Sequence, residues 1–182
     1  MEGQYGISGS MRKLQNILVL LITTHVAFAQ NSLLVKGNRY DGAIFTAKYE
    51  LPYQTNPLSE RRFIPTVEEV AKLEEQLRHE IKAINKDKPN QGKNYGPIIH
   101  RNLNDYVRQY IGFVTPEGER VVMINFLWNK LSLIERIKGY SLWTNGYEDD
   151  WITVFDGGSR YWQIKYNLRT SEFFDFYVNG VA

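Results

Sequence analysis

The chain of 182 residues contains no cysteine, which excludes disulfides, thiolate metal ligands and a cysteine nucleophile. A lipid cannot be attached at a mature N-terminal cysteine either, so we do not expect a bacterial lipoprotein. Histidine is scarce, with three in the chain, and the Gly-x-Ser-x-Gly motif of many hydrolases is absent. The sequence is therefore poor in the groups that catalysis and metal binding use, and we expect no cofactor and no metal.

Strong charge of either sign is also missing. The formal net charge is +2, and the lysines and arginines are scattered rather than gathered in a stripe, which argues against nucleic acid as a partner. Apolar residues make up 43% of the chain and aromatic residues 14%, which excludes disorder for most of it. We expect one globular domain over residues 30–182.

The start of the chain resembles a secretory signal peptide. A basic start at 11–13 precedes an apolar stretch at 14–28, and Ala27-Phe28-Ala29 is typical of a cleavage site. The apolar stretch holds about 15 residues, short of the ~20 that a membrane span needs. We expect a signal peptide at 11–29, an extension at 1–10 of non-native or mis-annotated origin, and an exported protein, periplasmic or extracellular.

One helix is strongly indicated. Thr66 and Glu69 form a capping-box pattern, and apolar residues then recur with a helical period of 3.6 as far as Asn85. The apolar positions are Val70, Leu73, Leu77, Ile81 and Ile84. Before this helix, we expect one strand at 43–51 within an otherwise irregular segment.

Two regions predict antiparallel hairpins. In the first, Tyr106–Trp128, the turn at 115–119 has Pro and Gly where a tight turn needs them, so paired residue numbers sum to 234. In the second, residues 151–182, we expect three strands. A loop at Gly157–Ser159 would pair Val154 with Trp162, and a loop at 169–171 would pair Lys165 with Asp175. Residues 129–148 between these regions predict a short helix at 131–138 or an irregular excursion.

The three-strand meander would have two unlike faces. One is apolar and is assigned to the core. The other mixes aromatic rings with polar groups, as a surface that binds a protein or a glycan does. Its candidate binding residues are Trp151, Tyr161, Gln163, Lys165, Asp175 and Tyr177. Large exposed apolar patches are rare on monomers, so coverage of this face by residues 30–62 or 129–148 is the more frequent outcome.

Four other features are explained better by structure than by chemistry. His79-Glu80 resembles the start of a zinc-protease motif, but Ala83 occupies the place of the second histidine. His100 has no orienting partner near it in sequence. The acidic run 148–150 lacks the spacing of a calcium loop. The glycines at 156–159 suit a hairpin turn, because no helix follows them to bind a phosphate.

Two runs carry a resemblance, RQYIGFVTPEGERVVMINFLW and FDGGSRYWQIKYNLRTSEFFDFYVNGVA, together with the capped helix after Ile64. Over residues 63–182 the chain resembles a group of small exported Bacteroidetes proteins of unknown function. The resemblance implies a secreted or periplasmic protein and supplies no catalytic residues. A helix followed by a meander is also similar to cystatin-like and NTF2-like domains, by analogy of fold alone.

The expected fold class is α+β, with one long N-terminal helix packed on a β-meander of four to six antiparallel strands. The expected function is a non-catalytic binding module that uses the aromatic and polar sheet face for a protein or glycan ligand. One alternative is an NTF2-like enzyme with a pocket between the helix and a curved sheet. Another is a structural or inhibitor-type protein that docks by its sheet edge. After cleavage of the signal peptide we expect no membrane span.

Overall fold

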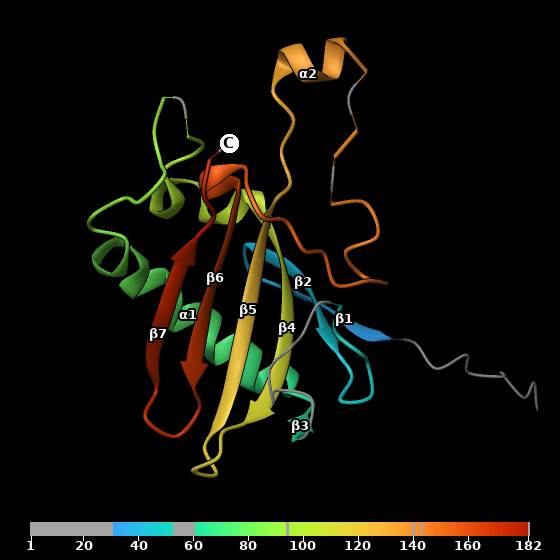
Figure 1. The fold of residues 1–182 in the computed structure, drawn as a ribbon, viewed down its shortest axis with the longest axis vertical. Helices are drawn as coiled ribbons and strands as arrows, with labels where there is room; N and C mark the ends of the chain where they lie inside the picture. Colours follow the sequence, from blue (N-terminus) through green and yellow to red (C-terminus); the bar gives the residue numbers. More distant parts are fainter. Residues whose placement is uncertain (1–30, 53–60, 94, 140, 143, 182) are drawn as a thin grey trace, which may run out of the picture.

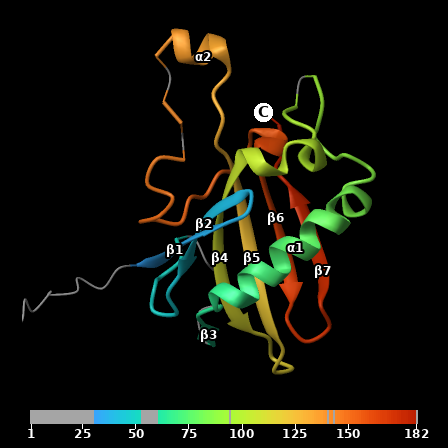
Figure 2. The ribbon, with the colours of Figure 1, turned by 180° about the vertical axis from the view of Figure 1, so that it is seen from behind.

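The computed structural model describes residues 31–52, 61–93, 95–139, 141–142 and 144–181. The predicted signal peptide and the extension before it lie outside these residues. Figure 1 shows a twisted sheet with the helix α1 (Val67–Ile84) behind it, and Figure 2 shows the same helix crossing the sheet at a slant from the other side. The described part is therefore a two-layer arrangement, with one face of the sheet against α1 and the other facing away from it.

The sheet has seven strands in the order β1-β2-β4-β5-β6-β7, and β3 pairs with β4 off this path. All pairs are antiparallel except β2 with β4, which is parallel. The strands are β1 (Ser32–Gly37), β2 (Tyr40–Phe45), β3 (Arg62–Phe63), β4 (Tyr106–Val114), β5 (Arg120–Trp128), β6 (Tyr161–Asn167) and β7 (Glu172–Val178). Short helical turns complete the elements: η2 (Ile99–Arg101), η3 (Leu103–Asp105), α2 (Leu133–Ile137) and η4 (Gly158–Arg160).

The predicted fold class is wrong in its architecture. Three strands precede the helix, so it is not N-terminal, and the sheet is a mixed one of seven strands. The extra strands arise in the segment expected to be mostly irregular. There, Asn38 and Arg39 form a two-residue turn with Arg39 at φ 71°, and Gly37 faces Tyr40 across it. The resulting β1–β2 hairpin lies against β4 and makes the sheet mixed.

The helix itself begins and ends where the sequence indicates. The Thr66 side chain accepts from the Glu69 amide at 3.1 Å, and Glu69 Oε2 accepts from the Thr66 amide at 3.0 Å, which completes the capping box. Asn85 is the C-terminal cap. The predicted apolar stripe is buried against the sheet at its first four positions, and Ile84 packs at the margin. The main core therefore lies between α1 and the sheet.

The two predicted hairpins had different outcomes. The first is confirmed: Phe113 faces Val121 and Tyr110 faces Ile124, so the pairs sum to 234. In the second, residues 151–156 form no strand, and β6 pairs with β5 instead. The strap, residues 147–156, crosses the sheet face that α1 leaves free. Side-chain amides form hydrogen bonds with its backbone carbonyls: Asn125 donates to Ile152 O at 2.9 Å, and Asn179 donates to Val154 O.

The β6–β7 pairing contains a bulge that the sequence analysis missed. Trp162 faces Val178 as predicted, but nearer the turn Tyr166 faces Phe173 rather than Phe174. The extra residue is in β7, where Asp175 adopts φ 50°. The expected contact between Lys165 and Asp175 still forms, at 2.8 Å, although Lys165 is paired in register with Phe174. Between the bulge and the turn, the two faces of β7 are therefore exchanged relative to the prediction: Phe173 packs against the core, and Phe174 faces outward.

The capping box at Thr66 gives a stability prediction. Thr66→Ala removes the side-chain acceptor at the start of a helix that buries its apolar stripe, so we expect a loss of about 1 kcal/mol. In a chain of this size that lowers the melting temperature by roughly 2–4 °C. Ser132→Ala is the matched control, because Ser132 caps α2 in the same way but α2 buries no residue. Equal losses in the two variants would contradict the prediction.

Candidate functional site

The outer face, which we define as the sheet face opposite α1, is covered over part of its area. Beneath the strap, Gln109 and Asn125 are buried, and the Asn125 amide donates to Gln109 Oε1 at 3.0 Å. The Gln109 amide donates to the carbonyls of Tyr147 and Asp150 at 2.8 and 2.7 Å. This ladder of side-chain amides holds the strap on β4 and β5. Of the two segments expected to cover the face, 129–148 contributes only its end, and from 30–62 Tyr49 and Leu51 pack on the same face.

Trp151 is not a surface residue, contrary to the prediction for the binding face. It lies in the strap with 7% of its surface exposed, and its ring meets Phe45 edge-on at a centroid distance of 5.8 Å. The two residues belong to a second, smaller apolar cluster with Ile111, Phe113 and Met123, against which Tyr49 and Leu51 also pack. Because Trp151 fills this cluster, we remove it from the candidate site.

Two of the other predicted residues are held within the fold. Gln163 continues the amide ladder, donating to Asn125 Oδ1 at 3.3 Å. Tyr161 is half-buried, and burial raises the pKa of its hydroxyl. Its ring lies so close to Gly157 that a Cβ there would come within 2.8 Å of it. These two side chains support the strap and the turn before β6 rather than facing solvent freely.

The remaining predicted residues, Lys165, Asp175 and Tyr177, form a solvent-facing group together with Phe174. We call these four residues the β6–β7 patch. Lys165 and Asp175 form an ion pair at 2.8 Å, and Tyr177 is 58% exposed. Lys165 Nζ lies 5.9 Å from the centroid of the Phe174 ring. Phe174 was assigned to the core face from sequence, and the bulge at Asp175 turns it outward. The patch therefore combines two open rings with a charged pair.

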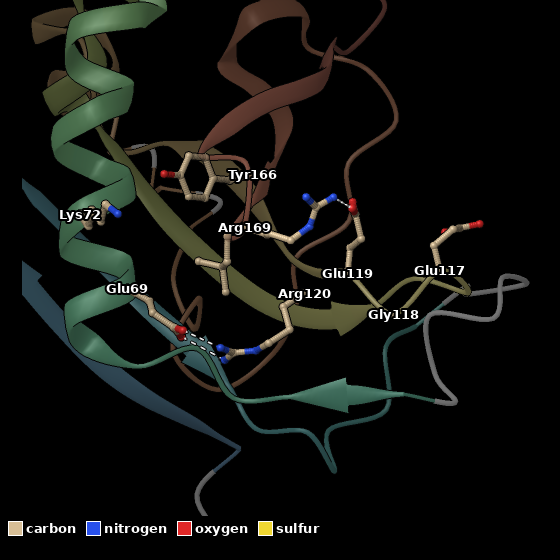
Figure 3. Close-up of a pocket in the computed structure, with 9 residues that line it drawn as sticks. Glu69, Lys72, Glu117, Gly118, Glu119, Arg120, Tyr166 and Arg169 are labelled. Carbon is tan, nitrogen blue, oxygen red and sulfur yellow. Dashed lines mark hydrogen bonds and ion pairs between the residues drawn. The ribbon is translucent and has the colours of Figure 1, made fainter.

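A separate cavity of about 690 Å³ opens between α1 and two turns, the one that joins β4 to β5 and the one that joins β6 to β7. Figure 3 shows charged side chains around it, with the Tyr166 hydroxyl directed at the helix. Arg120 donates to both carboxylate oxygens of Glu69, at 2.8 and 3.2 Å, and Arg169 donates to Glu119. The hydrogen bond from Arg169 lowers the pKa of Glu119, which therefore stays ionised.

Most of the titratable groups around this cavity are held by neighbouring side chains. Both of its paired carboxylates are held by arginines, and Tyr166 donates its proton to Gln76 Oε1 at 2.7 Å. General acid–base catalysis needs a group whose pKa lies near the working pH and whose proton is free to move. Glu69, Glu119 and Tyr166 are therefore already engaged with neighbouring side chains.

A buried ion pair between α1 and β4 was not predicted from the sequence. Glu74 Oε1 lies 3.3 Å from Arg108 Nε, and the two side chains are 1% and 0% exposed. Tyr110 donates its hydroxyl proton to the same carboxylate oxygen at 2.8 Å. Arg108 also donates to the carbonyls of Tyr106 and Leu103. Glu74 Oε2 has no hydrogen-bond partner within the described part of the chain.

A signal for this pair was present in the sequence. Glu74 lies within the apolar stripe of the helix, four residues after Val70 and three before Leu77. Arg108 alternates with Tyr106 and Tyr110 on the core-facing side of β4. A charge at each of these inward positions indicates a buried partner of the opposite sign, because an unpaired buried charge is strongly destabilising.

The other titratable candidates gather into no site. His100 lies near the end of α1, with its Nδ1 3.1 Å from Asn85 Nδ2. Burial lowers the pKa of His100, and the cations Arg101, Lys88 and Lys82 lower it further. His79 is exposed on the helix. Across the described ranges, no cluster of three or more His, Asp or Glu side chains is placed to hold a metal ion. No helix in those ranges has the length and apolar character to cross a membrane.

The glycines at 157 and 158 have a backbone role, although they do not form the expected hairpin loop. Both adopt a left-handed conformation, with φ of 86° and 59°. At Gly158 a Cβ would lie 2.0 Å from the carbonyl oxygen of Tyr95, so the close approach of two loops requires glycine here.

Comparison with known proteins adds no assignment, since no family model, no curated protein and no solved structure matches the chain.

The buried pair gives a prediction about stability. Arg108→Met leaves the Glu74 carboxylate buried without a cation, and we expect a loss of about 3–5 kcal/mol in the free energy of unfolding. The double variant Glu74→Met/Arg108→Met removes both charges and should recover most of that loss. Urea unfolding of the two single variants and the double variant forms a complete cycle. Additive effects in this cycle would contradict a direct coupling of the two side chains.

The same region predicts alkaline instability. Burial, and for Tyr110 also the Glu74 carboxylate, raises the pKa of Tyr106 and Tyr110 above the ordinary value of 10. Their stabilising contribution is present below the unfolded pKa and is lost as pH rises, because only the unfolded chain ionises there. Each group lowers the free energy of unfolding by ~1.4 kcal/mol per pH unit above about 10.

Absorbance at 295 nm and circular dichroism during an alkaline titration test this expectation. We expect a fraction of the tyrosines to ionise only when the secondary structure is lost. The variant Tyr106→Phe has one fewer buried hydroxyl, and its stability should fall less steeply with pH. Complete tyrosine ionisation in a chain whose circular dichroism stays native would contradict the assignment.

Proposed function

We propose that this chain is an exported, non-catalytic binding domain that recognises a protein or glycan ligand through the β6–β7 patch. The observation that carries the proposal is the open ring of Tyr177 beside the Lys165–Asp175 ion pair, on a sheet face that is otherwise largely covered. Export rests on the signal-peptide pattern at 11–29, which is a property of the sequence alone.

The chemistry of the patch favours a glycan over a protein. Aromatic rings pack against the apolar faces of sugar rings. The ammonium group of Lys165 can donate hydrogen bonds to sugar hydroxyls, and the carboxylate of Asp175 can accept hydrogen bonds from them. Phe174 and Tyr177 are 39% and 58% exposed, and Asp175 keeps a solvent-facing carboxylate on the bulge between them. A protein interface of ordinary size needs about 800 Å² on each partner, which is more than four side chains supply.

The two alternatives have less support. The sheet has two edges, β1 and β7. At the β7 edge, the bulge and the acidic residues Glu172 and Asp175 discourage the addition of a strand. An NTF2-like enzyme requires a pocket between the helix and the sheet. The centre of that space is packed, and its buried acid, Glu74, is held by Arg108 and Tyr110. At its margin lies the cavity of about 690 Å³, where arginines pair with Glu69 and Glu119.

Glycan-array screening of the mature protein, followed by titration calorimetry on any sugar found, tests the proposal. The variant Phe174→Ser/Tyr177→Ser should lower affinity at least about ten-fold, because stacking on an exposed ring contributes roughly 1–3 kcal/mol in comparable recognition. Its melting temperature should change little, since both side chains are exposed. Tyr161→Ala is less suitable, because Tyr161 is half-buried and its loss would affect folding.

A matched control distinguishes the patch from general surface effects. Leu33→Ser/Leu34→Ser changes two side chains of similar exposure on β1, at the opposite edge of the sheet. This control variant should bind as the unmodified protein does. Retained glycan binding in the patch variant would refute the proposal, and a protein captured through the patch without glycan affinity would replace the glycan with a protein ligand.

A further inference from the structure

The excursion between β5 and β6 carries α2 away from the body of the domain. In both Figure 1 and Figure 2, α2 stands at one extreme of the molecule, beyond the end of β5. None of its residues is buried, and a capping box of Ser132 and Glu135 fixes its start. A helical turn that has a capping box but buries none of its residues is a candidate contact site.

The exposed surface of α2 is apolar. Leu133, Ile134 and Ile137 are 74%, 65% and 77% exposed. At 3.6 residues per turn these three positions fall within about 100° of arc, so they form one face of the turn. Large aliphatic side chains with this exposure are costly in water, and three of them together indicate a surface that meets an apolar medium.

The charges around that face have a definite arrangement. Arg136 and Lys138 flank the apolar arc, one on each side, and both are exposed. Glu135 falls on the opposite side of the turn, and it lines two cavities with Arg160 of the domain body. The acidic side chain therefore faces inward, whereas the aliphatic side chains face away from the domain with a cation on each flank.

The neighbouring loop adds positive charge at the same end of the molecule. Lys93 lines a cavity together with Ser132 and Glu135, which places this loop beside α2. Lys93 is exposed. Lysines near an anionic lipid surface each strengthen attachment, and the effect falls within about 10 Å at ordinary salt.

We propose that α2 is a membrane-contact element, which lays Leu133, Ile134 and Ile137 into the headgroup boundary of an anionic lipid bilayer. An apolar face flanked by cations is the pattern of interfacial helices. The five residues of α2 lie on such a surface and do not cross it. A second copy of the chain is less favoured, because two such tips would bring their own cations together. This surface is distinct from the β6–β7 patch.

Co-sedimentation with lipid vesicles tests the proposal on the mature protein. We expect binding to vesicles of phosphatidylcholine mixed with phosphatidylglycerol, and weak binding to phosphatidylcholine alone. Leu133→Ser/Ile134→Ser/Ile137→Ser should lower partitioning at least about ten-fold. Arg136→Gln/Lys138→Gln should lower it on the anionic vesicles only. Leu33→Ser/Leu34→Ser, two exposed leucines on β1, and the patch variant Phe174→Ser/Tyr177→Ser should bind as the unmodified protein does.

A second measurement keeps the test independent of folding in the triple variant. Because the chain has no cysteine, Ile134→Cys introduces one site for an environment-sensitive fluorophore, and Leu34→Cys is the control. A blue shift at position 134 alone, on anionic vesicles, supports the proposal. The proposal is overturned if the protein does not bind vesicles or if the fluorophore shifts equally at both positions. It is also overturned if light scattering shows a dimer that the triple variant dissociates and no vesicle binding is found.

Discussion

The contact between Glu74 and Arg108 is the constraint around which the two layers are arranged. It is the described ion pair whose two members are both buried, and it connects the middle of α1 to β4. Tyr110 adds a hydrogen bond to the same carboxylate, while Arg108 reaches the carbonyls that precede β4. Because a displaced helix would leave both charges without partners, the pair fixes where α1 lies along the sheet. The apolar stripe supplies most of the stabilising contact but specifies position less sharply.

The opposite sheet face is organised by neutral groups instead. The strap crosses β4 and β5 as an extended segment, and the side chains of Gln109, Asn125 and Asn179 take up its backbone groups. Side-chain amides serve this role well because each carries both a donor and an acceptor. The arrangement buries a polar ladder at low cost, since its members satisfy one another. It also closes much of the face and leaves the β6–β7 patch open at one side.

Surface chemistry is thus separated in space. The β6–β7 patch offers rings and an ion pair on the outer face, the cavity beside Tyr166 is lined by paired charges, and α2 presents aliphatic side chains at the far end. A binding domain held at a membrane surface would use the first and the last of these together. α2 would fix the distance from the bilayer, and the sheet face would remain accessible to a ligand.

The sequence by itself determined the elements whose signals are local. The capping box at Thr66 and the turn at Pro116-Glu117-Gly118 each depend on a few neighbouring residues, so the start of α1 and the β4–β5 register followed from them. Tertiary structure alone decided which strand lies beside β6 and where Trp151 and Phe174 point. An alternating pattern shows that a strand has two faces but does not name its neighbour. Loop-closure entropy grows only with the logarithm of loop length, so the long connection from β5 costs roughly 2 kcal/mol more than a three-residue turn. The nine-residue strand β5 pairs with β6 in spite of that cost, in place of the local partner at 151–156. The covered outer face and the exposed patch both follow from that exchange.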